Sequence, residues 1–419
     1  MKPASNFSRT EVLTDRQNLA TDNRARVLVL TSTFPRWSSD TEPAFVYSLC
    51  KHLSNNYDIW VLAPHAPGAK THERFDRNIQ VVRFRYFLEW GENLAYQGGI
   101  LAKLRSKRLR YLLVVPFLIA QWVAILRLLA QQRFDVVHAH WLIPQGFLAA
   151  IAKVLLPHFP ALVCTSHGTD LNGLQSGMFA RIKRFSILQS DAYTVVSVDM
   201  KRNAQSLGVD MNRTSVIPMG VDARILFTPN AEVIRAHRQL LFVGRLDVQK
   251  GIELLIHVMP AILAEYSDCT LKIIGNGPQQ RQLQEQIDRM GLNAHIELVG
   301  AVPNVDLPLH FRNSTLLVFP SLGSEGLGLV CAEALACECP VVASNLPAVL
   351  EVVQHEISGL IFQQGDCKDL TSKILVMLAD PARRRAMGAA GREHVLAHFD
   401  WVRIETEFTR VFERVRKHE

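Results

Sequence analysis

Several features are scarce in this 419-residue chain, and each absence narrows what the protein can do. None of its seven cysteines forms a CxxC pair, and Cys337 and Cys339 are too close together for an ordinary disulfide or zinc site. No DxD sequence occurs, so nothing calls for a divalent metal. No G-x-G-x-x-G motif follows the first predicted strand, which argues against a nicotinamide dehydrogenase. We therefore expect buried, reduced thiols, no metal site and no bound cofactor.

Strong charge and long apolar runs are also missing. The net charge of +7 is modest and its basic residues are dispersed, which argues against nucleic acid as a partner. The apolar stretch 111–126 is shorter than the about 20 residues that a membrane-spanning helix needs. We interpret it as a buried helix. The alternative is that 103–126, which begins with a basic run, attaches peripherally to an anionic membrane.

The N-terminal segment is polar and contains Asp and Glu, which excludes a signal peptide there. We expect residues 1–25 to form a disordered tail. Together with the reduced cysteines, this composition predicts a cytoplasmic protein.

In both halves of the chain, short runs rich in β-branched residues, typical of strands, alternate with segments of helix length. Most predicted strands are continuous apolar runs, as in parallel sheets covered on both faces. We therefore predict an α/β fold of two doubly wound, Rossmann-like domains, 26–217 and 239–398, joined by a hinge at 218–238. The helical segment 399–419 is expected to cross back to the first domain. A ligand should lie where the carboxyl ends of the two sheets meet. The predicted strands are Arg26–Ser32, Ile59–Ala63, Val81–Phe84, Asp135–Ala139, Ala161–Ser166, Ala192–Ser197, Leu240–Gly244, Thr270–Gly275, Ile296–Gly300, Leu316–Pro320, Val341–Ser344 and Gly359–Phe362.

Two acidic residues flank a glycine-rich helix start in the second half. Glu325 precedes Gly326 and Gly328, a helix is predicted from about Leu329, and Glu333 lies inside it. Glycines let the backbone approach a ligand, and helix amides attract an anion or a sugar oxygen. The acids are expected about 7–9 Å apart, which suits two hydroxyl-bearing rings joined by a diphosphate. The alternative is a helix-capping Glu325 and a surface Glu333, but the apolar neighbours of Glu333 favour a binding site.

Two cations follow the first predicted strand of the second half. In LFVGRLDVQKG, Arg245 and Lys250 follow a glycine turn at a carboxyl strand end. A guanidinium fork and an ammonium group there could hold a diphosphate, and ordinary surface charges are the alternative. A further glycine turn, 275–278 (GNGP), closes the next strand and would form the floor of the same cleft.

A polar cluster follows a buried strand of the first half. The segment SHGTD places His167 and Asp170 at a carboxyl strand end, where sugar or acceptor contacts are expected. His167 could hydrogen-bond a hydroxyl or stabilise developing charge, and a histidine satisfied within its own loop is the alternative. The preceding strand ends in His138, His140 and Trp141. We take Asp170, His140 and Trp141 as the candidates for acceptor binding.

Together these segments resemble the retaining glycosyltransferases of family 4, which have the GT-B fold of two facing Rossmann-like domains. The resemblance extends from residue 26 to about 399. Its strongest element is the E-x7-E motif formed by Glu325 and Glu333, and the VGRL-x3-KG, IGNGP and SHGTD segments follow the family's order and spacing.

The resemblance implies a role for each of these segments. Arg245 and Lys250 would bind the donor diphosphate. Glu325 would contact the transferred sugar and Glu333 the nucleotide ribose, with His167 near the reacting sugar. Catalytic roles are thus implied for Glu325, Arg245, Lys250 and His167. The implied donor site comprises Arg245, Lys250, Gly275, Asn276, Gly277, Glu325, Gly326, Leu327, Gly328, Leu329, Val330 and Glu333.

One segment departs from the family pattern. The glycine-rich loop that commonly follows the first strand is replaced by residues 34–45, which contain no glycine. This FP…FV form is similar to branches that build bacterial surface polysaccharides. The departure leaves open whether the loop near Ala44 contacts phosphate.

The resemblance implies a metal-independent hexosyltransferase that moves a sugar, with retention, from a UDP-sugar or GDP-mannose. A glycan or a lipid-linked molecule would be the acceptor, in exopolysaccharide or cell-envelope glycan synthesis, with peripheral attachment to the inner face of the membrane as the alternative to a freely cytoplasmic enzyme. Two alternatives stay open. A nucleotide-sugar epimerase of the same architecture would release nucleotide without an acceptor. A non-catalytic partner of a polysaccharide assembly complex would keep the fold without turnover.

Overall fold

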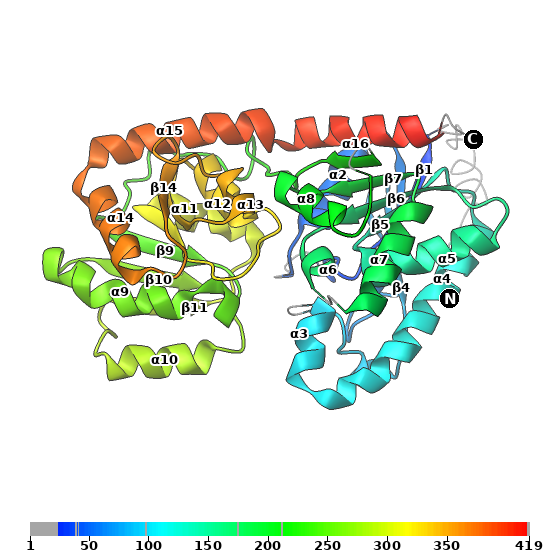
Figure 1. Ribbon diagram of the computed structural model, residues 1–419, viewed down its shortest axis with the longest axis horizontal. Coiled ribbons are helices and arrows are strands. Elements are labelled where there is room, and N and C mark those ends of the chain that lie inside the picture. The colour runs from blue at the N-terminus through cyan, green and yellow to red at the C-terminus, as the bar shows by residue number, and fades with distance from the viewer. Residues whose placement is uncertain are drawn as a thin grey trace, which may run out of the picture.

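The computed structural model describes residues 24–37, 40, 42–96, 99–173, 176–210 and 213–416. Two α/β lobes lie side by side, and two long helices run along one edge of both (Figure 1). Of the predicted tail 1–25, all but the last two residues lie outside the described part of the chain.

The first domain is built on an eight-stranded sheet in the order β3-β4-β2-β1-β5-β6-β7-β8. All neighbouring strands are parallel except β3 and β4, which are antiparallel. The sequence did not predict β3, because the exposed strand HERFD has no apolar run, nor the short strand β8. The strands are β1 (Arg26–Leu30), β2 (Asp58–Pro64), β3 (His72–Asp76), β4 (Ile79–Phe84), β5 (Val136–His140), β6 (Ala161–Ser166), β7 (Ala192–Val195) and β8 (Thr214–Val216).

Helices connect these strands and cover the sheet. They are α2 (Phe45–Leu53), η1 (Glu89–Gly91), α3 (Gly99–Ser106), η2 (Arg108–Leu113), α4 (Val114–Gln131), η3 (Leu142–Gly146), α5 (Phe147–Leu155), α6 (Thr169–Asn172), α7 (Gly177–Gln189) and α8 (Val198–Gln205).

The apolar stretch 111–126, which by itself is too short to cross a membrane, is part of a longer helix. Residues Arg108–Gln131 are continuously helical over 24 residues, and only 22% of their most apolar window is buried. By length and composition alone this helix could span a bilayer. However, α4 connects β4 to β5 within one sheet and packs on it through Phe117, Gln121 and Ile125. The helix that the sequence predicted to be buried is therefore buried on one side only: one side of α4 is core and the other is exposed.

The second domain contains a six-stranded parallel sheet in the order β11-β10-β9-β12-β13-β14. This is the 3-2-1-4-5-6 order of the Rossmann fold, whose connections reverse direction between β9 and β12. The strands are β9 (Gln239–Val243), β10 (Thr270–Ile274), β11 (Ile296–Gly300), β12 (Leu316–Phe319), β13 (Val341–Ser344) and β14 (Gly359–Phe362). The helices are η5 (Val248–Lys250), α9 (Ile252–Glu265), α10 (Gln280–Arg289), η6 (Asn304–Asp306), α11 (Leu307–Asn313), α12 (Leu329–Ala336), α13 (Pro347–Leu350), α14 (Cys367–Ala379) and α15 (Pro381–His398).

Strand β9 shows why these strands are continuous apolar runs. Leu240 and Phe242 join a core with residues of α9 and α14, whereas Leu241 and Val243 join a core with residues of α12 and α15. Each face of the sheet is therefore covered by its own helices, which confirms the predicted doubly wound α/β fold. All twelve predicted strands are present, with ends within two residues of the prediction.

Two stretches of chain connect the lobes and lie against each other. The backbone N–H of Val221 donates to Phe399 O at 2.7 Å. Gly220 packs so closely on Trp401 that a Cβ there would lie 2.4 Å from the indole ring. Helix α16 (Trp401–Arg416) then packs on α2 of the first domain, where Tyr57 donates to Glu413 at 3.1 Å.

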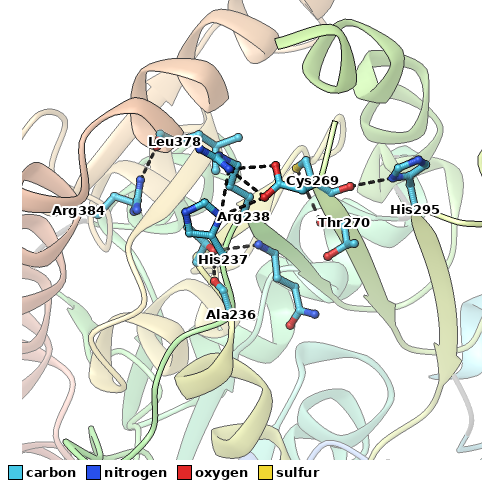
Figure 2. Close-up of polar contacts among 11 residues, drawn as sticks. Ala236, His237, Arg238, Cys269, Thr270, His295, Leu378 and Arg384 are labelled. Atoms are coloured by element: carbon cyan, nitrogen blue, oxygen red, sulfur yellow. Dashed lines mark hydrogen bonds and ion pairs between the residues drawn. The ribbon is translucent and has the colours of Figure 1, made fainter. Parts of the chain in front are cut away.

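A polar network lies at the N-terminal ends of the first strands of the second sheet (Figure 2). Arg238 donates to both carboxylate oxygens of Asp268, at 2.8 and 2.9 Å, and its guanidinium stacks over Tyr266. His295 hydrogen-bonds the carbonyl of Cys269 at 3.1 Å. This network lies at the strand ends opposite those that carry the candidate site residues, so we interpret it as structural.

Candidate active site

The candidate residues follow the strands at which each sheet reverses its connections. In the second domain, Arg245 follows β9 and Glu325 follows β12, the two strands at the reversal. In the first domain, Ala44 and Trp141 follow β1 and β5, which flank the equivalent point. Ligands of open α/β sheets bind outside the carboxyl ends of strands at such points. The topology therefore gathers the donor-side and acceptor-side candidates at one edge of each sheet.

Lys250 and Glu325 form an ion pair in the second domain. Lys250 Nζ lies 2.7 Å from Glu325 Oε1, and Ser321 donates to the same oxygen at 2.6 Å. Arg245 Nε lies 2.7 Å from Asp247 Oδ2. Each predicted phosphate-binding cation is thus held beside a carboxylate. A diphosphate would compete with these carboxylates for the two cations.

The glycine turns after β9 and β10 pack directly on each other. A Cβ at Gly275, whose φ is +136°, would lie 1.8 Å from Gly244 O, and one at Gly277 would lie 2.1 Å from Leu246 O. Leu246 N–H donates to Asn276 O at 3.0 Å. Only glycine fits both positions, so the GNGP turn supports the loop that carries Arg245.

Gly326 and Gly328 lead into α12, and Gly328 takes φ +87° at its N-cap. Glu333 on this helix is buried, and burial raises its pKa to about 8, while a hydrogen bond from Asn304 opposes that rise. A carboxyl group without a compensating cation is costly to bury in ionised form. Glu333 is therefore not the surface residue of the alternative interpretation, and it is largely protonated at neutral pH. Leu327 precedes α12, and Leu329 and Val330 are its first two residues.

On the first-domain side, His167 follows β6 and is surrounded by aromatic rings. The centroids of Trp141 and Phe45 lie 4.9 and 5.0 Å from its ring. Burial lowers the pKa of His167, and nearby His140 adds to the effect. The imidazole is therefore neutral at pH 7 and can donate or accept a hydrogen bond.

Asp170 and His140 lie behind His167. Asp170 accepts from the backbone N–H of His167 at 3.1 Å and from that of Leu142 at 2.8 Å. Burial raises the pKa of Asp170, and these hydrogen bonds oppose the rise. His140 is fully buried and lies 2.8 Å from His167, nitrogen to nitrogen. Both support the loop and are buried, whereas Trp141, the third acceptor candidate, is partly exposed.

The two domains touch where the Glu325 loop meets the His167 loop. A Cβ at Gly326 would lie 2.4 Å from His167 O, and one at Gly168 would lie 3.0 Å from the Gly326 Cα. The carboxylate of Glu351 accepts from the backbone N–H groups of Val198 and Asp199 at 2.9–3.2 Å. The structure is therefore closed, with the Glu325 loop against the His167 loop.

The glycine-free loop after β1 is held by side chains. Arg36 forms a bidentate pair with Asp40, each bond 2.7 Å long, and Arg83 donates to Pro35 O at 2.7 Å. Ala44 is the N-cap of α2, and the next residue, Phe45, contacts His167 and Trp141 with its ring. An aromatic side chain therefore occupies the approach to His167 from this loop.

The sequence did not identify four residues that contact the candidate residues or hold the two domains together at the site: Ser321, Asn304, Phe45 and Glu351. Ser321 lies four residues before Glu325, but a serine in a loop gives no signal of its own. Phe45 begins α2, Asn304 begins η6 and Glu351 lies in the turn after α13, and the fold brings them to the site. Among the described residues, no three His, Cys, Asp or Glu side chains are placed to hold one metal ion. All seven cysteines are unpaired, and six are buried.

Comparison with known proteins agrees with this geometry. Residues 44–224 match the family described as Glycosyltransferase Family 4, and residues 230–394 match Glycosyl transferases group 1. The chain is 30% identical over 294 residues to the phosphatidyl-myo-inositol mannosyltransferase of Mycobacterium leprae, which covers 69% of this chain and 76% of that protein.

Solved structures share the fold at lower identity. The sucrose-phosphate synthase of Thermosynechococcus elongatus superposes with a TM-score of 0.77 at 21% identity, covering 94% of this chain and all of that one. Anabaena HepE in complex with UDP-glucose gives 0.70 at 18% identity, covering 93% and 99%. The chain therefore belongs to family 4 of the glycosyltransferases, with the GT-B fold, and is an enzyme that transfers a sugar from a nucleotide-sugar donor.

Proposed function

We propose that this protein is a retaining, metal-independent hexosyltransferase in which Arg245 and Lys250 hold the donor diphosphate and His167 lies near the transferred sugar. The proposal is supported by the contact of the Glu325 loop, which carries the Lys250–Glu325 pair at the reversal point of the second sheet, with the His167 loop of the first domain. A sugar held by Glu325 would then lie against the first domain. Glu333, deeper on α12, would bind the nucleotide ribose.

The reaction that we propose is the same-face route implied by the family resemblance. The bond between the sugar's anomeric carbon and the diphosphate oxygen breaks, and the acceptor hydroxyl attacks the same face. The departing diphosphate oxygen takes the proton of that hydroxyl. Arg245 and Lys250 stabilise the negative charge that accumulates on the leaving group, and one such donor typically contributes about 3–4 kcal/mol to lowering the barrier. Attack from the face of departure retains the anomeric configuration.

The substrates are proposed at the level of class. A UDP-sugar is supported by the likeness to HepE, solved with UDP-glucose, and a mannosyl donor by the M. leprae relative, which is named a mannosyltransferase. That relative is named for a lipid, phosphatidyl-myo-inositol, which supports a lipid-linked acceptor. We place the enzyme in polysaccharide or cell-envelope glycan synthesis, in the cytoplasm, with peripheral membrane contact through 103–126.

A panel of UDP- and GDP-sugars, scored by released nucleotide with and without candidate acceptors, tests the proposal. We expect turnover with one donor, a product whose anomeric configuration matches the donor by NMR, and loss of turnover in Glu325→Ala. EDTA should leave the rate unchanged. Inversion in the product, or activity lost with EDTA and restored by manganese, would contradict the mechanism.

The same panel separates the two alternatives. An epimerase would release nucleotide at the same rate with and without acceptor, and a non-catalytic partner would bind donor without turnover.

A further inference from the structure

Eight large apolar side chains are exposed on two adjoining segments of the first domain. Trp90 and Leu112 are 76% and 73% exposed, values far from those of core residues. The eight are Phe87, Leu88, Trp90, Leu109, Tyr111, Leu112, Val115 and Ile119. The first three belong to the loop around η1, and the others to η2 and the start of α4. Contiguous exposed apolar surface of this kind marks an interaction site.

Several contacts hold the two segments together. Arg110 on η2 donates to Asn93, just after η1, at 3.1 Å. At the base of the η1 loop, the ring of Tyr86 lies 5.0 Å from the ring of Phe117 on α4. The η1 loop therefore lies against the η2–α4 helix, and we call the eight exposed side chains the apolar rim.

The helical part of the rim forms a stripe. Leu112, Val115 and Ile119 are spaced by three and four residues, so they share one side of the helix. The buried residues of α4, Phe117 and Ile125 among them, lie on the side that packs on the sheet. The stripe therefore faces away from the core.

The charges on the η2–α4 side of the rim are of one sign, whereas in η1 an exposed Glu89 pairs with Arg85. Between Glu92 and Asp135 the sequence contains seven basic residues and no acidic one. Lys107 and Arg108, at the start of η2, are exposed. Exposed apolar side chains beside a basic cluster fit an anionic lipid surface, in which the cations meet headgroups and the apolar groups enter the interface.

The rim also adjoins the acceptor side of the cleft. Helix α3, which leads into η2, lies against the end of α6: a Cβ at Gly173 would be 3.5 Å from Leu101. Helix α6 begins two residues after His167. Figure 1 shows α3 and the start of α4 together at one tip of this lobe. A bilayer at the rim would therefore lie next to the approach to His167.

We infer that the apolar rim binds anionic lipid bilayers in the plane of the interface and presents the acceptor side of the cleft to the membrane. Helix α4 stays in the fold, since it connects β4 to β5, so the contact is peripheral and not spanning. This inference adds to the proposed function the surface that would bring the enzyme to a lipid-linked acceptor, and the acceptor part rests on that proposal.

Flotation of the full chain with vesicles of phosphatidylcholine containing 30% phosphatidylglycerol, against pure phosphatidylcholine, tests the inference. We expect binding to the anionic vesicles that weakens at high salt. The triple variant Leu88→Ser, Trp90→Ser, Leu112→Ser should bind at least about tenfold more weakly. The double charge reversal Lys107→Glu, Arg108→Glu should weaken binding by at least about 20-fold. Trp90 fluorescence should shift to the blue on binding.

A matched control is Ile225→Ser with Ile234→Ser, two exposed residues outside the rim, which should bind as the unaltered protein does. Absence of binding to anionic vesicles, or equal losses in the control, would overturn the inference. So would a rim that pairs two copies of the chain, seen as a dimer in sedimentation that the triple variant abolishes. Donor turnover is measured separately: vesicle binding without turnover would defeat the proposed function alone, and turnover without vesicle binding would defeat the rim alone.

Discussion

The imidazole rings of His140 and His167 lie nearly in one plane, joined nitrogen to nitrogen. His140 Nδ1 is 2.8 Å from His167 Nε2, the centroids are 5.1 Å apart and the planes differ by 11°. Burial lowers the pKa of His140 to about 3, so both rings are neutral and share one proton between these nitrogens. Among the described residues, His140 Nε2 has no partner. Because a buried N–H without an acceptor is rare, we expect the proton on His140 Nδ1, donated to His167.

This arrangement would place the proton of His167 on Nδ1. His140→Phe removes the donor and should lower kcat about tenfold, the worth of one neutral hydrogen bond, while His140→Asn keeps an N–H near the Nδ1 position and should retain most activity. Nitrogen-15 shifts of the His167 ring report the tautomer directly. An unchanged tautomer in His140→Phe would contradict the assignment, and equal activity losses in both variants would indicate a merely structural role.

Removing the charge of Lys250 from its pair with Glu325 should have a large effect on kcat and a small effect on stability. Because this ion pair is partly exposed, Lys250→Met should change the free energy of unfolding by at most about 1 kcal/mol. If Lys250 stabilises the leaving diphosphate, kcat should fall on the order of 100- to 1,000-fold. Lys272→Met is the control, since Lys272 pairs with Glu297 at 3.6 Å in the same domain. Steady-state kinetics and urea unfolding measure the two effects, and a normal kcat would exclude Lys250 from the mechanism.

Because Glu333 is buried, we expect the free energy of unfolding to fall as the pH rises. Its folded-state pKa of about 8 lies above that of an unfolded glutamate, about 4.3, so the folded chain holds the extra proton between these values. The free energy of unfolding should therefore decrease from about pH 4 to pH 8 by an amount on the order of a few kcal/mol. Glu333→Gln should remove this slope and raise the melting temperature at pH 8, while weakening donor binding. Melting curves of both proteins across this range measure the difference. A parallel pH dependence in the two would show that another group titrates.

The sequence predicted the strands of both sheets more completely than the contacts within the site. Continuous apolar runs located the twelve strands, because both faces of a doubly wound sheet must be covered. Glycine turns and charged residues at strand ends located Arg245, Lys250 and Glu325, because parallel strands bring their carboxyl ends to one edge. The His140–His167 bond was not predicted, because the side-chain period of a strand does not say which ring turns toward a neighbouring strand's loop.

Contacts between the domains could not be predicted for a different reason. Gly326 with His167, and Glu351 with α8, depend on how two separately folded bodies are oriented. Neither the spacing nor the polarity of these segments encodes that orientation. The half-exposed α4 was misjudged for the related reason that composition does not reveal which side of an apolar helix has a partner.

The close approach of Gly326 to His167 predicts that added volume opens the cleft. In Gly326→Ala the new Cβ would lie 2.4 Å from His167 O, too close for any non-bonded contact, so the loops must separate. Since catalysis is sensitive to shifts of about 1 Å, kcat should fall about 100-fold with little change in unfolding. Gly177→Ala, with nothing within 4 Å of its Cβ, is the control. Full activity in Gly326→Ala would mean that turnover does not use this closed arrangement.

We expect the Glu351 carboxylate to help hold the two domains together. It accepts the first N–H groups of α8 from the other domain, where the helix dipole favours a negative charge. Such a contact is worth about 1–2 kcal/mol, so Glu351→Ala should shift the balance toward an open form by roughly tenfold. Small-angle scattering should then show a larger radius of gyration without donor, reversed by saturating donor if the ligand bridges both domains. Glu356→Ala, which loses only an exposed pair with Arg383, should scatter like the unaltered protein. If Glu351→Ala also scatters like the unaltered protein, the domains are held together by α15 and α16 and not by this carboxylate.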